Sequence, residues 1–506
     1  MCEEKEMTSC FLSTINFFHM KNRIFPNAVF LSVTTWLIIS GCTKILDKQP
    51  VTDLITNTGA TSISALDAEN SLAGVYDAET GYAYGLEFNV LDRITNGDAK
   101  ADNCYAGGDN PNNISIDLFT FNAANDNIGR DWKDAFGIVA TANITLAQVA
   151  ACTDPALTPT RKNQILGEVR FMRAYTYFDL VRLFGRVPIM LEPVDQTNSE
   201  ALIASTLIPQ SSVDSVYEAI LADLWFARAN VQADNTPPNK MVITKGAVNS
   251  ILAKVYASMP TPNWDSVAYY CDQVIPNYSL VPNFNSLWDN SAKNNKEAIW
   301  EFNYVGYSKV GNWIPSQFLT GGWKKFNTPT NDLVNVYRAE GDSVRLKASI
   351  TFVDYGWSDA YWKDPLHYPV LSKYPDPNDG TNDFYAIRLA DILLLRAEAY
   401  NSKADIGNAA MMVNKVRARV GLPATTAANA NDMALAIEKE RRLELAFEGH
   451  RWFDLQRTGR ALTVMNAFTN GAGQNLNYHV QDYQIIYPVP QNQLDNNLLL
   501  TQNPGY

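Results

Sequence analysis

The feature that most constrains the fold is a long helical pattern over residues 160–184. Apolar side chains fall on two of its faces, so neighbouring helices have to cover both, as in stacked helix hairpins. The first face carries Leu166, Val169, Met172 and Tyr175, and the second carries Phe171, Ala174 and Phe178. We therefore expect this helix at the centre of a helical scaffold.

Further segments have the same periodicity and the start and stop signals of helices. They indicate a mainly α fold, an alpha-alpha superhelix of tetratricopeptide-like helix pairs with a repeat of roughly 34 residues. The predicted helices cover residues 65–79, a stretch from Asn127 onward, 213–230, 245–259, 265–275, 384–401, 406–420 and 432–447.

Two stretches interrupt this pattern. Residues 80–125 are rich in turns, and residues 283–382 are rich in Trp, Tyr, Asn, Gly and Pro, with strand-like pieces such as 298–304. We expect a single domain over residues 63–506. Its parts are an N-terminal helical part (63–282) with a binding loop near 92–110, an irregular insertion with short β-hairpins (283–382), and a C-terminal helical part and tail (383–506).

The N-terminus has the pattern of an export signal. Lys21 and Arg23 precede an apolar run that ends in Ser40-Gly41-Cys42, and a Cys in the first mature position is typical of a bacterial lipoprotein. The prediction is a signal peptide over 1–41, with 1–19 an over-long start, then lipidation of Cys42 and an extended tether over 42–62. A signal that ends in Cys by coincidence, or a buried core segment, explains the charge and the length less well.

Composition and motifs exclude several classes of function. The 41 basic against 53 acidic residues give no basic footprint for nucleic acid. Cys104, Cys152 and Cys271 are scattered and odd in number, which indicates neither a disulfide framework nor a metal site. The sequence contains no GxSxG elbow, HExxH helix or phosphate-binding GxxxxGK[ST] loop. We therefore predict no catalytic residues and no metal ligands.

One helix nevertheless carries Glu440, Glu444 and Glu448. A general acid and base would need two such carboxylates in one cleft with separated pKa values. Abundant Arg offers each Glu a charge partner three or four residues away, which favours a structural role. A lipid-anchored glycoside hydrolase is thus the weaker hypothesis.

The aromatic loops are the better candidates for a binding site. Trp and Tyr cover the C–H faces of sugar rings with little side-chain entropy to lose, while amides and carboxylates match hydroxyl groups. The alternative, that these aromatics fill the core beneath long loops, stays open for each residue. The predicted ligand-binding residues are Trp313, Trp323, Trp357, Tyr361, Trp362, Asp98, Asn103 and Tyr105.

No cofactor is expected. The Asp- and Asn-rich loop from Asp98 to Asp109 is compatible with a structural Ca²⁺, but it lacks an EF-hand pattern, and Asx turns explain it equally well.

Several segments, taken in order, resemble the SusD/RagB family of nutrient-binding outer-membrane lipoproteins. They reach from the predicted lipidation site to the last residue. The segments are CTKILDKQP at 42–50, EVRFMRAYTYFDLVRLFG at 168–185, RLADILLLRAEA at 388–399, NKVRARVGL at 414–422, ERRLELAFEGHRWFDLQR at 440–457, YPVP at 487–490 and QNPGY at 502–506.

The resemblance implies a non-catalytic protein with a tetratricopeptide-like helical fold. It also implies lipid anchoring in the outer membrane, a position facing the cell exterior, and a SusC-like TonB-dependent transporter as partner. The expected function is to bind an oligosaccharide or polysaccharide and deliver it to that transporter for import. Capture of a peptide or another nutrient on the same scaffold, and a purely structural scaffold, are the alternatives.

Overall fold

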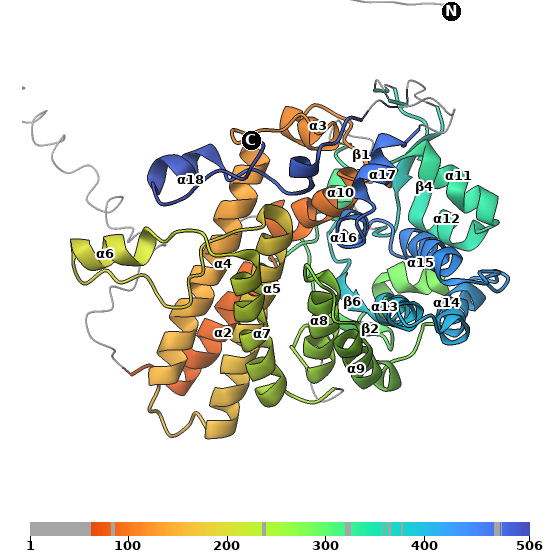
Figure 1. The fold of residues 1–506 in the computed structure, drawn as a ribbon. Helices are drawn as coiled ribbons and strands as arrows, with labels where there is room; N and C mark the ends of the chain where they lie inside the picture. Colours follow the sequence, from red (N-terminus) through yellow and green to blue (C-terminus); the bar gives the residue numbers. More distant parts are fainter. Residues whose placement is uncertain are drawn as a thin grey trace, which may run out of the picture. The chain divides into compact units, whose positions relative to one another are not determined.

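The computed structural model describes residues 62–81, 87–234, 239–318, 325–356, 358–359, 361–362, 366–375, 378–469, 476 and 478–506. The predicted signal peptide, Cys42 and nearly all of the predicted tether lie outside these residues. From Gly59 to Tyr506 the chain forms one unit, and it is mainly helical (Figure 1).

Local sequence signals set the boundaries of the N-terminal helices. Helix α2 (Ala65–Glu79) begins with a capping box between Ser64 and Asp67. Helix α5 (Pro159–Phe184) begins after the N-cap Thr158 with Pro in its first turn, and it ends at Gly185, whose φ of 72° favours glycine. Helices α4 (Asp126–Ala151) and α7 (Val213–Asn230) complete this part of the scaffold.

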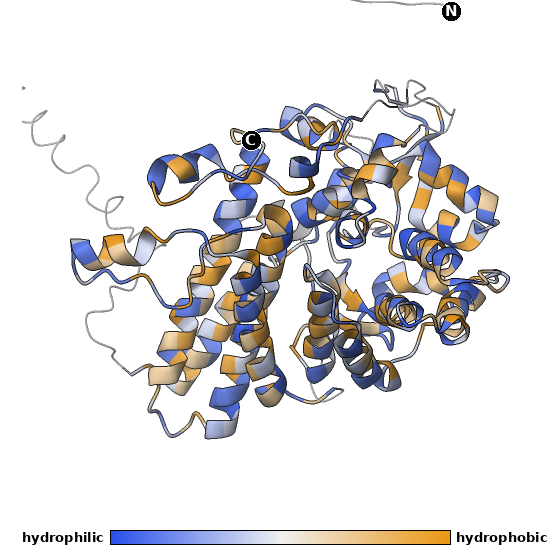
Figure 2. Cartoon of the chain, viewed as in Figure 1, coloured by the Kyte–Doolittle hydropathy of each residue, from blue (hydrophilic) through white to orange (hydrophobic). Residues whose placement is uncertain are grey.

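Helix α5 is the central helix of this part, as its sequence predicts. It packs against α4, α7 and α2, and its buried residues occur on several sides. Figure 2 shows polar and apolar residues interspersed along these helices. Helix α4 is long and apolar enough to cross a membrane by length and composition alone, but it lies against α2 and α5, and Ile128, Trp132 and Ile138 belong to the core.

The remaining long helices pack side by side in the tetratricopeptide-like manner. Helix α8 (Lys245–Ser258) packs on α9 (Trp264–Val274), and α9 packs on α13 (Leu389–Asn401). Helix α13 then contacts both α14 (Ile406–Arg419) and α15 (Ala430–Glu444). The mainly α fold is confirmed.

Two small antiparallel sheets join the insertion to the rest of the chain: β1 (Cys104–Tyr105) with β3 (Thr328–Pro329), and β2 (Ala298–Phe302) with β6 (Phe384–Arg388). A third, β4 (Ile350–Val353) with β5 (Tyr368–Leu371), lies within the insertion. The prediction of one helix over 384–401 is therefore wrong in its first turn and a half. Residues 384–388 form β6 because β2 supplies a pairing partner that no local pattern reveals.

The insertion is also more helical than expected, since it contains α11 (Asn331–Glu340) and α12 (Ser343–Ser349). The other elements are short. They are the π-helical segments η1 (Glu87–Asp92) and η2 (Thr95–Ala99), the 3₁₀ segments η3 (Ile275–Asn277), η4 (Phe284–Trp288), η5 (Asn290–Ala292) and η6 (Asp482–Ile485), and helices α3 (Pro111–Asp117), α6 (Ser199–Thr206), α10 (Ile314–Phe318), α16 (Arg451–Arg457), α17 (Ala461–Asn466) and α18 (Gln491–Asn496).

Candidate functional site

The turn-rich segment after α2 meets the insertion at the small sheets. Tyr105 on β1 lies opposite Thr328 on β3. Strand β3 lies against β5, and β5 pairs with β4, with Tyr368 opposite Val353. These contacts bring side chains from distant parts of the chain to one place.

Five aromatic side chains gather there, and we call them the aromatic platform: Tyr105, Tyr355, Tyr361, Trp362 and Tyr368. The rings of Tyr105 and Tyr361 stack with centroids 4.0 Å apart and an interplanar angle of 21°. The ring of Tyr368 lies 5.5 Å from Tyr355 and 6.2 Å from Trp362. Tyr105 and Tyr368 are buried, whereas the other three are half-buried and present part of their surface to solvent.

The carboxylate of Asp359 organises the platform. Its Oδ2 accepts hydrogen bonds from the hydroxyls of Tyr105 (2.9 Å) and Tyr368 (2.5 Å). Its Oδ1 accepts from the backbone N–H of Tyr361 (3.1 Å) and of Trp362 (2.9 Å). One side chain therefore closes the turn that carries the two half-buried aromatics and fixes the two buried ones beside it.

Lys325 and Gly107 complete this arrangement. The Lys325 ammonium lies 3.8 Å from the ring centroid of Tyr368 and 4.7 Å from that of Tyr355. Burial lowers the pKa of Lys325 to about 8, with Asp359 acting in the opposite direction. The N–H of Gly107 donates to the Lys325 carbonyl at 2.8 Å, and a Cβ at position 107 would lie 2.7 Å from Asp359 Oδ2. A side chain at position 107 would therefore displace the Asp359 carboxylate.

The phenol groups of the platform remain protonated at neutral pH. Burial raises the pKa of Tyr361 and of Tyr368 well above the usual range, and it raises the pKa of Tyr355 to about 12. The Tyr361 hydroxyl donates to Asn331 Oδ1 at 2.8 Å. These hydroxyls therefore act as neutral hydrogen-bonding groups.

The structure brings three of the predicted binding residues together, namely Tyr105, Tyr361 and Trp362. Trp313 is half-buried and packs instead on Tyr307, with ring centroids 4.4 Å apart. Trp323 and Trp357 lie outside the described residues.

Asp98 and Asn103 are buried, and both make hydrogen bonds within the chain. Asn103 Nδ2 donates to Asp98 Oδ1 at 3.1 Å, and Asp98 Oδ2 accepts from the N–H of Gly449 at 2.8 Å. Asn103 Oδ1 accepts from Arg442 Nε at 3.0 Å. In this conformation the two side chains connect the turn-rich segment to the C-terminal helices and present no surface to a ligand.

Sequence reasoning missed Tyr368, Asp359 and Lys325. Tyr368 begins a buried strand, where an aromatic residue is expected for packing alone. Asp359 precedes Tyr361 by two residues, which is the spacing of an Asx turn, and this signal would have identified it. We find no local signal for Lys325.

Glu440 and Glu444 lie on α15, but the expectation that Glu448 lies on the same helix is wrong, because α15 ends at Glu444 and Glu448 lies in the turn after it. All three carboxylates form ion pairs in the protein interior. Arg388 Nη1 lies 2.6 Å from Glu444, and Arg388 Nε lies 2.8 Å from Glu448. Arg345 Nη1 lies 2.7 Å from Glu440. The partners come from the insertion, from β6 and, for Arg419, from α14, and not from an Arg three or four residues away as expected. Arg441 and Arg442 pair with Asp454 and Asp332 instead.

This environment keeps the Glu444 carboxylate ionised. Burial alone would raise the pKa of Glu444, but Arg419, Arg388 and Arg345 hold it well below the usual range. A carboxylate of this kind carries no proton at neutral pH and does not act as a general acid. Among the described residues, no group of three or more His, Cys, Asp or Glu has the geometry to hold a metal ion.

Both halves of the chain match models of known protein families. Residues 346–506 match the family model of the SusD family, and residues 45–257 match a model described as starch-binding and associating with the outer membrane. A SusD-like protein of Bacteroides ovatus is 25% identical over 498 residues, which cover 88% of this chain and 86% of that protein. SusD-like protein P38 of Formosa agariphila is 26% identical over 527 residues and covers 94% and 98%.

Solved structures show the same fold. A laminarin-binding SusD-like protein superposes with a TM-score of 0.72 at 25% identity, over 88% of this chain and 100% of that one. A SusD superfamily protein of Bacteroides vulgatus gives a TM-score of 0.74 at 21% identity, over 87% and 99%. Fold, sequence relatives and both family models agree, and the chain is a member of the SusD-like family.

Proposed function

We propose that this protein binds an oligosaccharide or polysaccharide on the aromatic platform and delivers it to a SusC-like TonB-dependent transporter for import. The observation that carries the proposal is the pair of half-buried rings, Tyr361 and Trp362, held by one carboxylate that also fixes Tyr105 and Tyr368. Such a rigid aromatic surface loses little entropy when a flat ring settles on it.

Sugar chemistry fits the platform. The C–H faces of a pyranose ring pack on the exposed parts of Tyr361 and Trp362, while Asp359 and the neutral tyrosine hydroxyls lie beside them for hydroxyl groups. The family model over residues 45–257 describes starch binding, and one structural relative binds laminarin. Both names support a glucan as the first ligand to test.

The membrane part of the proposal rests on the N-terminus and on the family. The same family model describes association with the outer membrane. We propose that acylated Cys42 anchors the protein there, with its domain facing the cell exterior, and that residues 42–62 act as a tether beside the transporter. Binding through a few stacking contacts gives modest affinity, which suits a protein that has to release its ligand.

Isothermal titration with laminarin, starch oligosaccharides and a peptide mixture tests the proposal. Trp362→Ala should weaken glucan binding about thirtyfold, as expected for losing an aromatic anchor worth about 2 kcal/mol. Trp225→Ala is the matched control, because Trp225 is 50% exposed on α7, away from the platform, and it should bind like the wild type.

Two results would contradict the proposal. Binding to peptides and to no glycan would favour peptide capture on the same scaffold. Release of shorter products from a polysaccharide by the purified protein would favour a glycoside hydrolase.

A further inference from the structure

The two stacked rings of the aromatic platform belong to segments that are far apart in the sequence. Tyr105 lies on β1, and Tyr361 lies between β4 and β5. The Tyr361 hydroxyl is bonded to Asn331, the first residue of α11. The stacking therefore depends on how the residues before β1 are held against the start of α11.

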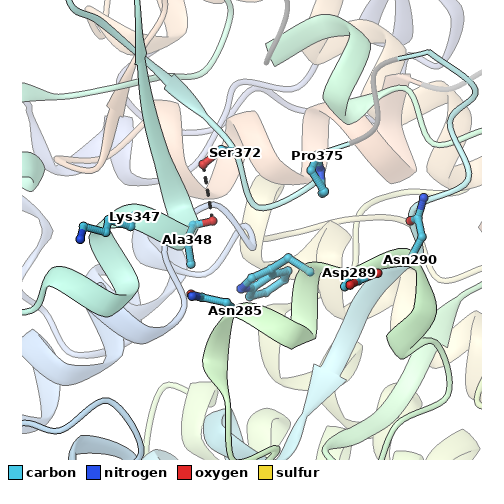
Figure 3. A pocket seen from close by; sticks show the side chains of 8 residues that line it. Asn285, Asp289, Asn290, Lys347, Ala348, Ser372 and Pro375 are labelled. Carbon is cyan, nitrogen blue, oxygen red and sulfur yellow. Dashed lines mark hydrogen bonds between the residues drawn. The ribbon is translucent and has the colours of Figure 1, made fainter.

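The other end of the β4–β5 ladder lies away from the platform. Beyond the pair of Ile350 and Leu371, Ala348 and Ser372 line a hollow with a volume of about 520 Å³ (Figure 3). None of the described residues that line this hollow belongs to the platform. The contacts that bear on the two stacked rings are those on the side of β1 and α11.

The residues before β1 meet the start of α11 at Thr330, the N-cap of that helix. The Thr330 N–H donates to the Asn103 carbonyl at 3.0 Å, and its hydroxyl donates to the Asp102 carbonyl at 2.9 Å. All three residues are buried. These bonds join the two backbones, but they leave the side chains of Asn103 and Asp332 to be fixed by another group.

That group is the guanidinium of Arg442, in the last turn of α15. Its Nε donates to Asn103 Oδ1 at 3.0 Å. Its Nη2 donates to the Asp102 carbonyl at 2.8 Å and to Asp332 Oδ2 at 2.8 Å. The Arg442 side chain is only 9% exposed. One side chain thus bonds at the same time to the residues before β1 and to the first turn of α11.

The contacts of Arg442 close a ring around the aromatic stack. On one side the chain continues from Asn103 into β1 and Tyr105. On the other side Asp332 is followed back along α11 to the residue that accepts the Tyr361 hydroxyl. The two aromatic rings meet between these sides, with centroids 4.0 Å apart. A shift of the guanidinium would therefore move one aromatic ring against the other.

The arrangement has a firm base and requires an arginine. Leu443, the next residue of α15, is buried, and its carbonyl accepts the hydroxyl of Tyr337 from α11 at 2.7 Å. Helix α11 is thus bonded to α15 beside Arg442. The three acceptors lie around one planar guanidinium, whose donors point in fixed directions. A lysine ammonium has the same charge on a single atom and cannot replace both Nε and Nη2.

We propose that Arg442 is a positioning residue of the glycan site, which holds Tyr105 and Tyr361 in the stacked arrangement that the ligand meets. The guanidinium acts through Asn103 and Asp332 and does not touch the ligand itself. This role rests on the proposed function. It also gives a task in ligand binding to one residue of the ERRLE stretch at 440–444.

Titration of two charge-conserving variants with laminarin tests this role. Arg442→Lys should bind about tenfold more weakly, or by about 1.4 kcal/mol, which matches the cost of ordering one or two side chains on binding. Arg441→Lys is the matched control, because Arg441 is the neighbouring residue of α15, is 5% exposed, and pairs with Asp391 on α13 and Asp454 on α16. It should lower the unfolding temperature by a similar amount and bind laminarin like the wild type.

A double-mutant cycle tests the route through α11. Asn331→Ala removes the acceptor of the Tyr361 hydroxyl, so the position of Arg442 then matters less for that ring. The double variant Arg442→Lys, Asn331→Ala should lose less affinity than the sum of the two single losses. Fully additive losses would overturn this route.

A milder variant covers the case in which Arg442→Lys does not fold. Asp332→Asn weakens one bond of the guanidinium at a carboxylate that is 28% exposed. It should reduce laminarin affinity about threefold, because a charge-assisted bond becomes a neutral one. Unchanged affinity in this folded variant would overturn the role of Arg442.

The outcomes separate this role from the proposed function. Wild-type affinity in Arg442→Lys, or equal losses in the Arg442 and Arg441 variants, overturns the positioning role. If Trp362→Ala still weakens binding in that case, the proposed function stands. Absence of laminarin and starch binding by the wild-type protein overturns both.

Discussion

Replacement of Asp359 is the most direct way to test whether the aromatic platform is organised in advance of binding. Asp359→Ala removes the acceptor of four hydrogen bonds but none of the aromatic rings. The Tyr105 hydroxyl then donates to the Tyr368 hydroxyl, 2.5 Å away, and the Tyr368 hydroxyl donates to Thr328 Oγ1 at 3.5 Å. The groups left without a partner are therefore the N–H groups of Tyr361 and Trp362.

The size of the effect follows from that count. Without the turn, Tyr361 and Trp362 gain freedom in the unbound protein, and ordering each side chain on binding costs about 0.5–1.5 kcal/mol. Two side chains give about 2 kcal/mol, or about thirtyfold in Kd. Asp359→Asn retains an Oδ1 acceptor for both N–H groups, so its affinity should stay within about threefold of the wild type.

Isothermal titration with laminarin measures these affinities, and circular dichroism during heating checks that both variants fold. The Asp359→Ala variant should lose affinity through a more unfavourable entropy of binding, because the rings themselves are intact. Wild-type affinity in a folded Asp359→Ala variant would refute the idea that the carboxylate prepares the platform. Equal losses in the Ala and Asn variants would indicate that Asp359 contacts the ligand directly.

Other predictions concern stability, packing and anchoring. Glu444→Gln should lower the unfolding free energy by about 3–5 kcal/mol in chemical denaturation, because it leaves a buried excess of positive charge. Burial raises the pKa of Asp102, but Arg442 and Arg451 outweigh it and lower the pKa to about 2. Asp102 should thus contribute about 2 kcal/mol above pH 4, which is lost as the pH falls toward 2, and Asp102→Asn should remove that part of the acid transition. Gly107→Ala should weaken laminarin binding about tenfold through its contact with Asp359, whereas Gly407→Ala, at a site with free space, should not. Cys42→Ala should move the full-length protein from the outer-membrane fraction to the soluble fraction and abolish labelling with palmitate.

The scaffold helices could be predicted from the sequence because their signals are local. Residues 65–79 and 213–230 match α2 and α7 exactly in their bounds, and Ser64 and Ser212 supply the N-caps. The prediction was wrong at 384–388, where the first residues of the predicted helix form strand β6. Strand β6 exists because β2, far away in sequence, pairs with it, and helical periodicity contains no information on such pairing.

The site was predictable in part. Many aromatic residues outside helical periodicity pointed to a binding surface, and Tyr105, Tyr361 and Trp362 do lie together. Their contact depends on β1 reaching β3 across more than two hundred residues of sequence, so no local pattern could select these aromatics over Trp313. The burial of Asp98 has the same origin, since its partner Gly449 belongs to the C-terminal part.

The ion pairs that hold the insertion are separate from the aromatic platform, and this affects how such proteins can acquire a new ligand preference. Arg345 and Lys373 bind it to Glu440 of α15 and to Glu448 in the turn after α15, and neither belongs to the platform. The segment between β4 and β5, which carries Tyr355, Asp359, Tyr361 and Trp362, begins and ends on one antiparallel ladder. Because β4 and β5 are paired, the two ends of the segment stay at strand spacing whatever lies between them. The residues between the strands can therefore be exchanged without changing the ladder. Transplanting the corresponding segment of a relative would give this scaffold a new ligand preference without disturbing the ion pairs that support it.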